Sequence, residues 1–328
     1  MTILAGRMVG SRIAKLSTND IKPLRPVGSM PMWYYPRARL FRYPIPTEFE
    51  FAYINREGEV VISGPFLYAR CFQNGLAEVI LPGDQPSGAL EPELSFCPRF
   101  GRLTYLRPDG NEVSADRRDW SALDHGLFEG LAAWRTDGGY RYRDESGEFV
   151  GSAKFRSASR FREGLAVVSE SRKLSTDPES LEFYYDDDYF YIDRNFNRVI
   201  PGPYLAANPF SEKLASVMVG GKWGFIDHAC EFQIPRRYDW AGSFVDGLAP
   251  VEKLGLVGFI NKRGRTIVPS KFKDARDFGD GLAPATLDAR YWGFIDKKGK
   301  FAIEPKFLGA FPFSEGLALV YLPSSPKR

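Results

Sequence analysis

The sequence predicts an all-β fold made of seven tandem copies of one short unit, which fill residues 49–322. Three observations predict this fold class. Aromatic residues and glycines recur at fixed spacings, large and small side chains alternate with period two at the start of a copy, and the array lacks helical periodicity. The copies are clearest at 191–217, 222–251, 257–285 and 291–320, and more divergent at 51–79, 103–134 and 140–168.

The spacings are counted from the residue that ends the first strand of each copy. In six copies it is Asp or Asn: Asn55, Asp144, Asp193, Asp227, Asn261 and Asp296. Arg107 takes this place in the remaining copy. An aromatic residue follows after eleven residues, an alanine after fourteen and a phenylalanine after seventeen, and a Gly-Leu-Ala motif follows in most copies. So many coincidences at fixed offsets exclude chance.

Each copy predicts three or four short strands. The first strand is expected near 51–55, 222–227, 257–261 and 291–296, where large and small side chains alternate. The Asp or Asn then begins a tight hairpin, with glycine supplying a positive φ at Glu57-Gly58, Arg263-Gly264 and Lys298-Gly299. We expect the second strand, such as 301–303, to stop at the following proline, which cannot donate to a ladder. The aromatic–Ala–Phe stretch is a compact loop or short strand, and Gly-Leu-Ala begins another strand.

The recurring apolar residues are the predicted core, buried between neighbouring units. In the last three copies they are Phe244, Phe278, Phe313, Phe272, Phe307, Ala241, Ala275, Ala310, Leu248, Leu282 and Leu317. The recurring Asp and Asn could be taken as a ring of acids. Since Asn replaces Asp twice and a turn follows at once, we interpret them as the first residues of hairpin turns.

The array can close in two ways. A β-propeller-like ring is favoured, because only closure removes the exposed edge strands that invite aggregation. It requires the last strand, 317–321, to pair with the first strand, 51–55. The alternative is an open β-solenoid, in which 39–43 takes that place beside the first strand.

Outside the array, the sequence predicts a basic leader at 1–48, packed on the array, and a tail at 323–328. The leader holds eight Lys and Arg against two acids. Two inserts, 82–102 and 170–188, interrupt the repeat. Such loops collect recognition residues on one face of a rigid repeat.

Composition limits the compartment and the partners. The sequence has no apolar run long enough to span a membrane, and its first residues make a poor secretory signal. The three cysteines, Cys71, Cys97 and Cys230, cannot all pair, which favours a reducing compartment and predicts a cytoplasmic protein. The leader lacks the dense basic run of a polyanion-binding segment, so we expect no nucleic-acid partner. The oligomeric state is left open.

The residues that carry chemistry are sparse. The two histidines, His125 and His228, lie in different copies, and no catalytic or nucleotide-binding motif occurs. We therefore expect no catalytic residue, no cofactor and no metal site. Two alternatives stay open at this point: a calcium site at Asp186–Asp188, and an acid pair assembled from distant copies.

The candidate partner-binding residues lie where the second insert runs into the next strand. They are Tyr184, Tyr185, Asp186, Asp187, Asp188 and Tyr189. Aromatic rings offer contact area at low entropic cost, and acids steer a basic partner. The alternative is a solvated acidic loop whose last aromatics are strand residues.

The strings KWGFID, YWGFIDKKGK and FSEGLA resemble the bacterial WG repeat family, also called KWG repeats. The resemblance is strong over 222–320, weaker over 49–217, and does not cover the leader or the inserts. It implies all-β units, a bacterial origin and protein recognition more than catalysis. The favoured function is a non-enzymatic protein-binding scaffold, in its sharpest form an immunity-type protein that neutralises a secreted toxin with a basic domain. The alternative is a carbohydrate-active or other hydrolytic enzyme with carboxylates on one face of the array.

Overall fold

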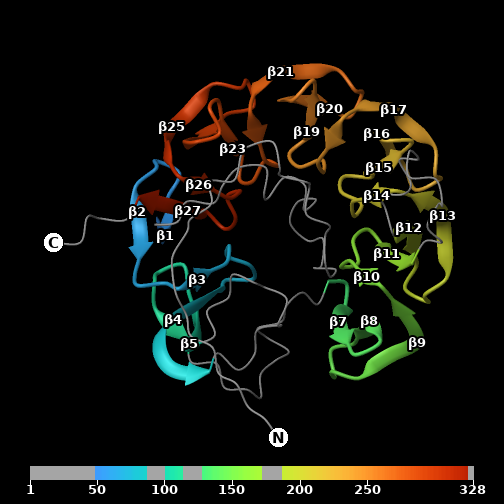
Figure 1. Cartoon of the computed structure of the whole chain (residues 1–328), viewed down its shortest axis with the longest axis horizontal. Helices are drawn as coiled ribbons and strands as arrows, with labels where there is room; N and C mark the ends of the chain where they lie inside the picture. Colours follow the sequence, from blue (N-terminus) through green and yellow to red (C-terminus); the bar gives the residue numbers. More distant parts are fainter. Residues whose placement is uncertain (1–48, 87–99, 114–127, 172–186, 324–328) are drawn as a thin grey trace, which may run out of the picture.

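The structure, a computed structural model, describes residues 49–86, 100–113, 128–171 and 187–323. These residues form seven antiparallel sheets arranged as blades of a ring, and no helix occurs among them (Figure 1). The chain is a seven-bladed β-propeller. The predicted fold class is therefore confirmed, and the ring forms rather than the open solenoid.

Five blades have four strands that follow one another in the sequence. The first holds β3 (Tyr68–Ala69), β4 (Ala77–Pro86), β5 (Phe100–Leu106) and β6 (Glu112–Val113). The next four-stranded blade holds β10 (Ser157–Ala158), β11 (Ala166–Ser171), β12 (Asp187–Ile192) and β13 (Arg198–Tyr204). It is followed by β14 (Ala206–Ala207), β15 (Ala215–Val219), β16 (Lys222–Ile226) and β17 (Phe232–Tyr238).

The last two of these blades carry the clearest copies of the repeat. One holds β18 (Trp240–Ala241), β19 (Leu248–Lys253), β20 (Leu256–Asn261) and β21 (Thr266–Phe272). The other holds β22 (Asp274–Ala275), β23 (Ala283–Thr286), β24 (Trp292–Ile295) and β25 (Phe301–Phe307). A further blade has three described strands, β7 (Ala132–Thr136), β8 (Gly139–Arg143) and β9 (Phe149–Phe155). In the four blades from β10 to β25 the two-residue strand is innermost and the seven-residue last strand lies at the rim (Figure 1).

The seventh blade closes the ring by joining the two ends of the repeat array. It holds β26 (Gly309–Ala310), β27 (Ala318–Pro323), β1 (Phe49–Ile54) and β2 (Val60–Ser63). β1 pairs antiparallel with β27, with Phe51 opposite Tyr321 and Ile54 opposite Ala318. This is the strand pairing that ring closure was expected to require.

Blades and sequence copies are out of phase. The copy that starts at Lys222 supplies the two outer strands β16 and β17, whereas β14 and β15 in the same sheet come from the copy before it. Every copy therefore contributes to two blades. A blade cannot form from one copy alone, which couples each copy to its neighbours along the chain.

The outer strands correct one prediction. β17, β21 and β25 do not stop at Pro235, Pro269 and Pro305 but run through them to the following aromatic residue. These strands are the outermost of their sheets, so a missing N–H on the outward side leaves no ladder partner unsatisfied. The pairing shifts register at this point, between Trp292 and Phe294 in the last of these blades.

The Trp-Gly pair has a steric explanation at this register shift. A Cβ added to Gly224 would lie 2.7 Å from the carbonyl oxygen of Ile234 on the neighbouring outer strand. The bulged outer strand therefore crosses directly over the glycine, and a side chain there would push it away.

The predicted hairpin turns are confirmed. The Asp296 side chain accepts the backbone N–H groups of Lys298 and Lys300 at 2.9 and 3.0 Å, and Gly299 has a φ of +78°. Asp144, Asp193, Asp227 and Asn261 accept the equivalent pair of N–H groups. The recurring Asp and Asn are thus turn residues, as interpreted.

The predicted core is confirmed for ten of its eleven residues, while Leu317 is only partly buried. The recurring phenylalanines join neighbouring blades. Phe278, in the turn after β22, lies 5.0 Å (between ring centroids) from Phe259 on β20 of the preceding blade. Phe313 meets Phe294 in the same way at 4.8 Å. The spacing in the sequence therefore encodes the contact between blades rather than the interior of one blade.

Candidate functional site

The antiparallel topology divides the loops of the propeller between two faces. The turn between the first and second strands of a blade and the hairpin between the third and fourth strands lie at the same end of the sheet. We call that end the turn face. The connection between the second and third strands lies at the opposite end, which we call the insert face.

Both predicted inserts belong to the insert face. One joins β4 to β5 and the other joins β11 to β12, and the described strands extend into each insert from both sides. In the β14–β17 blade the same connection is tight, because Val219 already pairs with Lys222. The leader 1–48 and the tail residues 324–328 lie outside the described residues, so the predicted placement of the leader on the array stays a prediction.

The six candidate binding residues are split by the end of the described segment. Tyr184, Tyr185 and Asp186 lie outside the described residues. Asp187, Asp188 and Tyr189 are the first residues of β12, where Asp187 is opposite Ser171 and Asp188 is opposite Glu170. The second half of the candidate site therefore starts a strand of a blade.

Asp187 is held inside that blade. Only 8% of the residue is exposed. Its carboxylate lies 2.7 Å from the Nε of Arg156 and accepts a hydrogen bond from the Ser169 hydroxyl at 3.0 Å. Ser169 in turn lies 2.7 Å from the hydroxyl of Ser157 on the innermost strand. These contacts of a buried carboxylate, one of them with the exposed Arg156, anchor the end of β12, so Asp187 has a structural task.

A second ion pair crosses the same blade at its exposed edge. The Arg198 guanidinium lies 2.9 Å from the Glu170 carboxylate and 3.9 Å from the centre of the Phe190 ring. Asp188 and Tyr189 are partly exposed. The base of the acidic insert is thus fixed to the blade by two arginines, Arg156 and Arg198.

The turn face carries a ring of carboxylates that the sequence analysis missed. In one blade, the acid that precedes the Gly-Leu motif accepts a hydrogen bond through its carboxylate. The donor is the backbone N–H of the residue at the glycine position of the same motif in the next blade. The six pairs are Glu129 with Gly164, Glu163 with Lys213, Glu212 with Gly247, Asp246 with Gly281, Asp280 with Gly316 and Glu315 with Gly75, at 2.8–3.0 Å. We call these pairs the clasps. At the remaining junction Asn74 takes the place of the acid.

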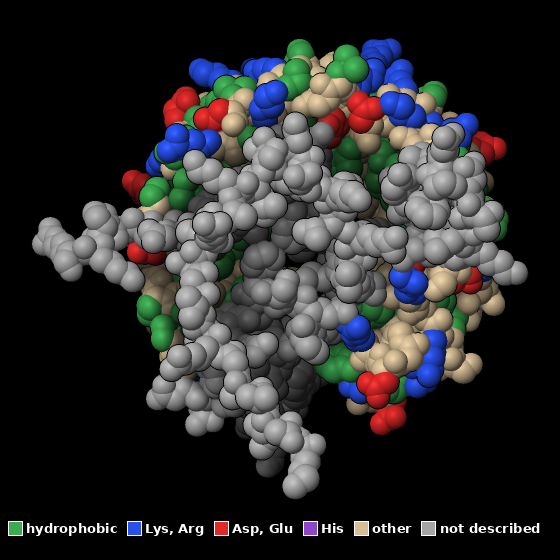
Figure 2. Space-filling model, in the orientation of Figure 1, with side chains coloured by type: hydrophobic (Ala, Val, Ile, Leu, Met, Phe, Trp, Pro, Cys, Tyr) green, Lys and Arg blue, Asp and Glu red, His purple; other side chains and the backbone are tan. Residues whose placement is uncertain are grey.

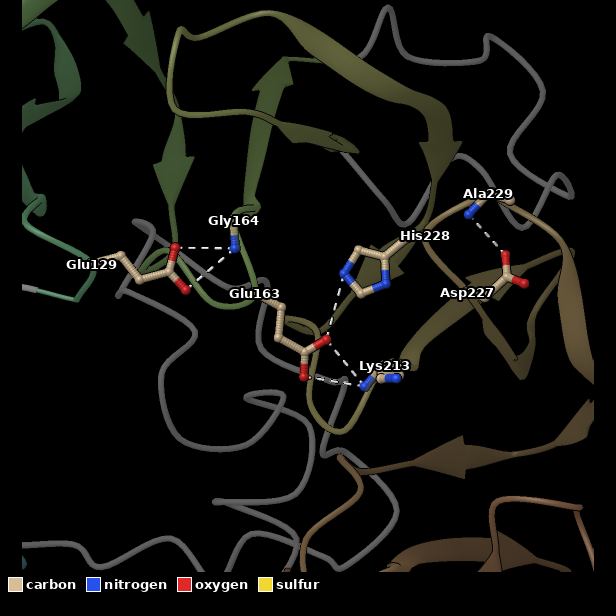
Figure 3. A network of polar contacts seen from close by, with 7 residues as sticks. All are labelled: Glu129, Glu163, Gly164, Lys213, Asp227, His228 and Ala229. Atoms are coloured by element: carbon tan, nitrogen blue, oxygen red, sulfur yellow. Dashed lines mark hydrogen bonds and ion pairs between the residues drawn. The ribbon is translucent and has the colours of Figure 1, made fainter.

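A basic side chain reinforces several clasps from the hairpin of the next blade. Glu212 is 2.8 Å from the Lys262 ammonium, and Asp246 is 3.5 Å from that of Lys297. Figure 3 shows Glu163 between the Lys213 backbone and the ring of His228, whose Nε2 is 3.4 Å away. Partial burial opposes ionisation of Glu212, but the hydrogen bonds from Lys262 and the Gly247 N–H hold its pKa below its ordinary value.

The clasp acids sit in an unusual backbone conformation. Glu163 and Gly164 have φ of +55° and +80°, and Arg162 and Leu165 exchange both hydrogen bonds of a two-residue hairpin. Both positions of such a turn need positive φ, which is uncommon for glutamate. A signal was present in the sequence, because an acid precedes the Gly-Leu position in six copies. Its partner lies a full copy away, so no local pattern indicated the contact.

One acid near the inner strands differs from the clasp acids. Burial raises the pKa of Asp277 to about 7, although the Ser243 N–H, 3.3 Å away, and the charges of Arg162 and Arg276 favour the carboxylate. Gly242 makes room for it, because a Cβ there would lie 2.5 Å from the Asp277 carboxylate. Asp277 therefore packs against the preceding blade.

The turn-face acids are arranged for structure rather than proton transfer. Hydrogen bonds from Ser146 and the following backbone hold the pKa of Asp144 below its ordinary value, and the Glu231 N–H does the same for Asp227. A carboxylate stabilised in this way is a poor general acid near neutral pH. Among the described residues no group of three or more His, Cys, Asp or Glu side chains could hold a metal ion. The same residues contain no helix long and apolar enough to cross a membrane.

Comparison with known proteins gives a family match. A family model described as a WG containing repeat matches residues 51–81, 140–173, 189–223, 223–256, 258–291 and 292–322, which together make up more than half of the chain. The divergent copy at 103–134 is not matched. No curated protein matches the chain.

Several solved structures are similar in shape at low sequence identity. A HIRA fragment is 6% identical, with a TM-score of 0.29 over 44% of this chain and 51% of its own, so the chain spans about half of that structure. BamB from Moraxella catarrhalis is 8% identical, with a TM-score of 0.36 over 77% of this chain and 83% of its own. The WD40 β-propeller domain of Doa1 is 10% identical, with a TM-score of 0.35 over 87% of this chain and 96% of its own.

Proposed function

Because the chain belongs to the WG repeat family, we propose that this β-propeller repeat scaffold is non-enzymatic and binds another protein through its insert face. The observation that carries the proposal is the interruption of a rigid ring on that face by an acidic segment. Residues 170–188 hold seven acids against Arg172 and Lys173, for a net charge of −5. A partner with a basic surface fits this charge.

The ring supports such a role because it presents loops from a stiff frame. The phenylalanine contacts and the clasps join neighbouring blades, and the pairing of β1 with β27 closes the ring. The ion pairs of Arg156 and Arg198 hold the two strands that lead into the acidic insert. Loops held by a rigid scaffold lose less conformational entropy on binding than free segments do.

The finer form of the proposal is an immunity-type protein in the bacterial cytoplasm, which neutralises a toxin by covering a basic domain of it. Electrostatic steering favours this role, since an inhibitor of a toxin gains from rapid association. The acidic insert would approach the basic surface first, and Tyr184, Tyr185 and Tyr189 would supply contact area.

The experiment compares association rates after capture of a partner from the source cell. The test variant is Asp186→Asn with Asp188→Asn, which keeps Asp187 because that carboxylate anchors β12. The matched control is Glu57→Gln with Glu59→Gln, an exposed acidic pair on the turn face. We expect the test variant to associate about tenfold more slowly at low salt and the control to associate at the wild-type rate.

Equal association rates for wild type and test variant at low salt would remove the acidic insert from the interface. The immunity role has its own test, in which the captured partner is expressed with and without this chain. Growth arrest by the partner alone, relieved by co-expression, is expected. A partner that is harmless when expressed alone would overturn the immunity role but would not contradict the proposal of a protein-binding scaffold.

A further inference from the structure

A second charged surface lies on the turn face, at the tips of the β20–β21 and β24–β25 hairpins. It consists of the residues two and four positions after the Asp or Asn that begins each hairpin, namely Arg263, Arg265, Lys298 and Lys300. All four are exposed, and we call them the basic patch. Figure 2 shows lysine and arginine side chains along the upper rim, over the arc of β17, β21 and β25 in Figure 1, with Asp and Glu side chains between them.

The basic patch has no structural task within the described part of the chain. The preceding residue of each hairpin, Lys262 or Lys297, pairs with a clasp acid. Further along the hairpin, Lys271 donates to the carbonyl of Gly299 in the next blade. By contrast, the four side chains of the basic patch make no hydrogen bond, ion pair or ring contact with a described residue. Their charge is therefore available to a ligand.

The two outer hairpins that carry the basic patch hold an excess of positive charge. Residues 261–273 hold five cations and no acid, and residues 296–307 hold four cations against two acids, for a net charge of +7. The equivalent positions of the next hairpin around the ring are Glu57 and Glu59, and one of those on the preceding hairpin is Glu231. An acid thus stands at an equivalent hairpin position on each side of these two blades.

The acids on either side of the basic patch indicate whether its ligand is extended or compact. An extended polyanion such as duplex DNA gains affinity by neutralising many phosphates in a row, and along this rim it would meet Glu57, Glu59 or Glu231. A compact group of carboxylates can contact the two arginines and two lysines without meeting the flanking acids. Arginine also binds carboxylates through two parallel hydrogen bonds, which suits an acidic side-chain cluster.

We propose that the basic patch is a second protein-binding surface, which takes a compact Asp- and Glu-rich segment of a partner protein. It lies on the turn face, whereas the two strands that lead into the acidic insert meet it at the insert face. This inference does not depend on the proposed role of the acidic insert, because the two surfaces share no residue.

The test uses the full chain and a short fluorescent peptide made of glutamate and glycine. The variant replaces Arg263, Arg265, Lys298 and Lys300 by Asn, which copies the tip of the β12–β13 hairpin, where Asn195 and Asn197 occupy these positions in the same kind of turn. We expect fluorescence anisotropy to show peptide binding by the wild type at low salt, and at least about tenfold weaker binding by the variant. The control, Glu57→Gln with Glu59→Gln, should bind the peptide as well as or better than the wild type.

Circular dichroism and the urea midpoint establish that the Asn variant is folded. The double variant Arg263→Asn with Lys298→Asn should bind the peptide with an affinity between those of the wild type and the Asn variant. Equal binding of the peptide by wild type and Asn variant would overturn the proposal. So would tighter binding of duplex DNA than of the peptide, if the Asn variant loses it, since the patch would then serve a nucleic acid. Self-association that is lost in both the Asn variant and the control would assign the patch to a second copy of this chain instead.

Discussion

The Glu315 carboxylate accepts the backbone N–H of Gly75 at 2.9 Å and so joins two turns that are 240 residues apart in the chain. Glu315 belongs to the closing blade, and Gly75 to the β3–β6 blade beside it. The pairing of β1 with β27 completes the closing blade, while this clasp fixes that blade to its neighbour. On the other side, the Lys306 ammonium donates to the Gly58 carbonyl at 3.0 Å.

Replacing Glu315 by Ala should lower the free energy of unfolding by about 1 kcal/mol, since it removes a charged acceptor from a partly solvated hydrogen bond. The measurement is the urea unfolding midpoint. Glu57→Ala is the control, because Glu57 is an exposed acid on the same face with no side-chain partner among the described residues. Equal midpoints for the two variants would mean that the clasp does not contribute to closure.

The repeat could be predicted from sequence because its contacts recur at fixed spacing. Phe278 and Ala275 stand at positions that every unit needs for packing against its neighbour, and the turn at Asp296 is local in the chain. The strand pairing that closes the ring follows from the same argument, since the first and last copies each lack one neighbour.

The remaining features depend on contacts that no local pattern encodes. The clasp of Glu163 joins residues 50 positions apart. The passage of β25 through Pro305 depends on its place at the outer edge, which is a property of the whole sheet. At the candidate site, acids that look alike in sequence separate in space: Asp187 is buried against Arg156, whereas Asp188 is partly exposed.

Truncating Phe278 to Ala should destabilise the fold by about 3–5 kcal/mol, because it leaves a cavity between two blades. Lys298→Ala should change the free energy of unfolding by no more than about 0.5 kcal/mol. Lys297 is a less suitable control than its neighbour, since its ammonium lies 3.5 Å from the Asp246 clasp. Urea midpoints that coincide for Phe278→Ala and Lys298→Ala would contradict the burial of the phenylalanine.

Substitution of two glycines in equivalent hairpin turns measures the cost of backbone strain separately from the cost of a clash between blades. Gly147 and Gly299 occupy equivalent positions with φ of +83° and +78°. A Cβ on Gly299 would lie 2.5 Å from Val268 of the preceding blade, whereas a Cβ on Gly147 would meet nothing within 4 Å. Gly147→Ala should therefore cost about 1–2 kcal/mol from the left-handed backbone alone. Gly299→Ala should lower the free energy of unfolding by at least about 1 kcal/mol more than Gly147→Ala does. If urea unfolding gives the same loss for both variants, Gly299 does not lie as close to Val268 as described.

The raised pKa of Asp277 predicts a pH-dependent free energy of unfolding whose sign can be worked out. Its pKa is raised from 3.8 to about 7 in the folded chain. Between these values the folded chain keeps a proton that the unfolded chain has lost, so rising pH lowers the free energy of unfolding. The stabilisation that Asp277 adds to the free energy of unfolding is fully present below pH 3.8 and is lost as pH rises through about 7.

Asp277→Asn removes this dependence while keeping an oxygen that can accept the Ser243 N–H. The variant should have nearly the wild-type urea midpoint at about pH 4 and a higher midpoint than the wild type at about pH 8. Asp227→Asn is the matched control with the opposite sign, because hydrogen bonds lower the pKa of Asp227 and its contribution is lost as pH falls. Midpoints of Asp277→Asn that run parallel to the wild type from pH 4 to pH 8 would show that the carboxyl ionises as freely in the folded ring as in the unfolded chain.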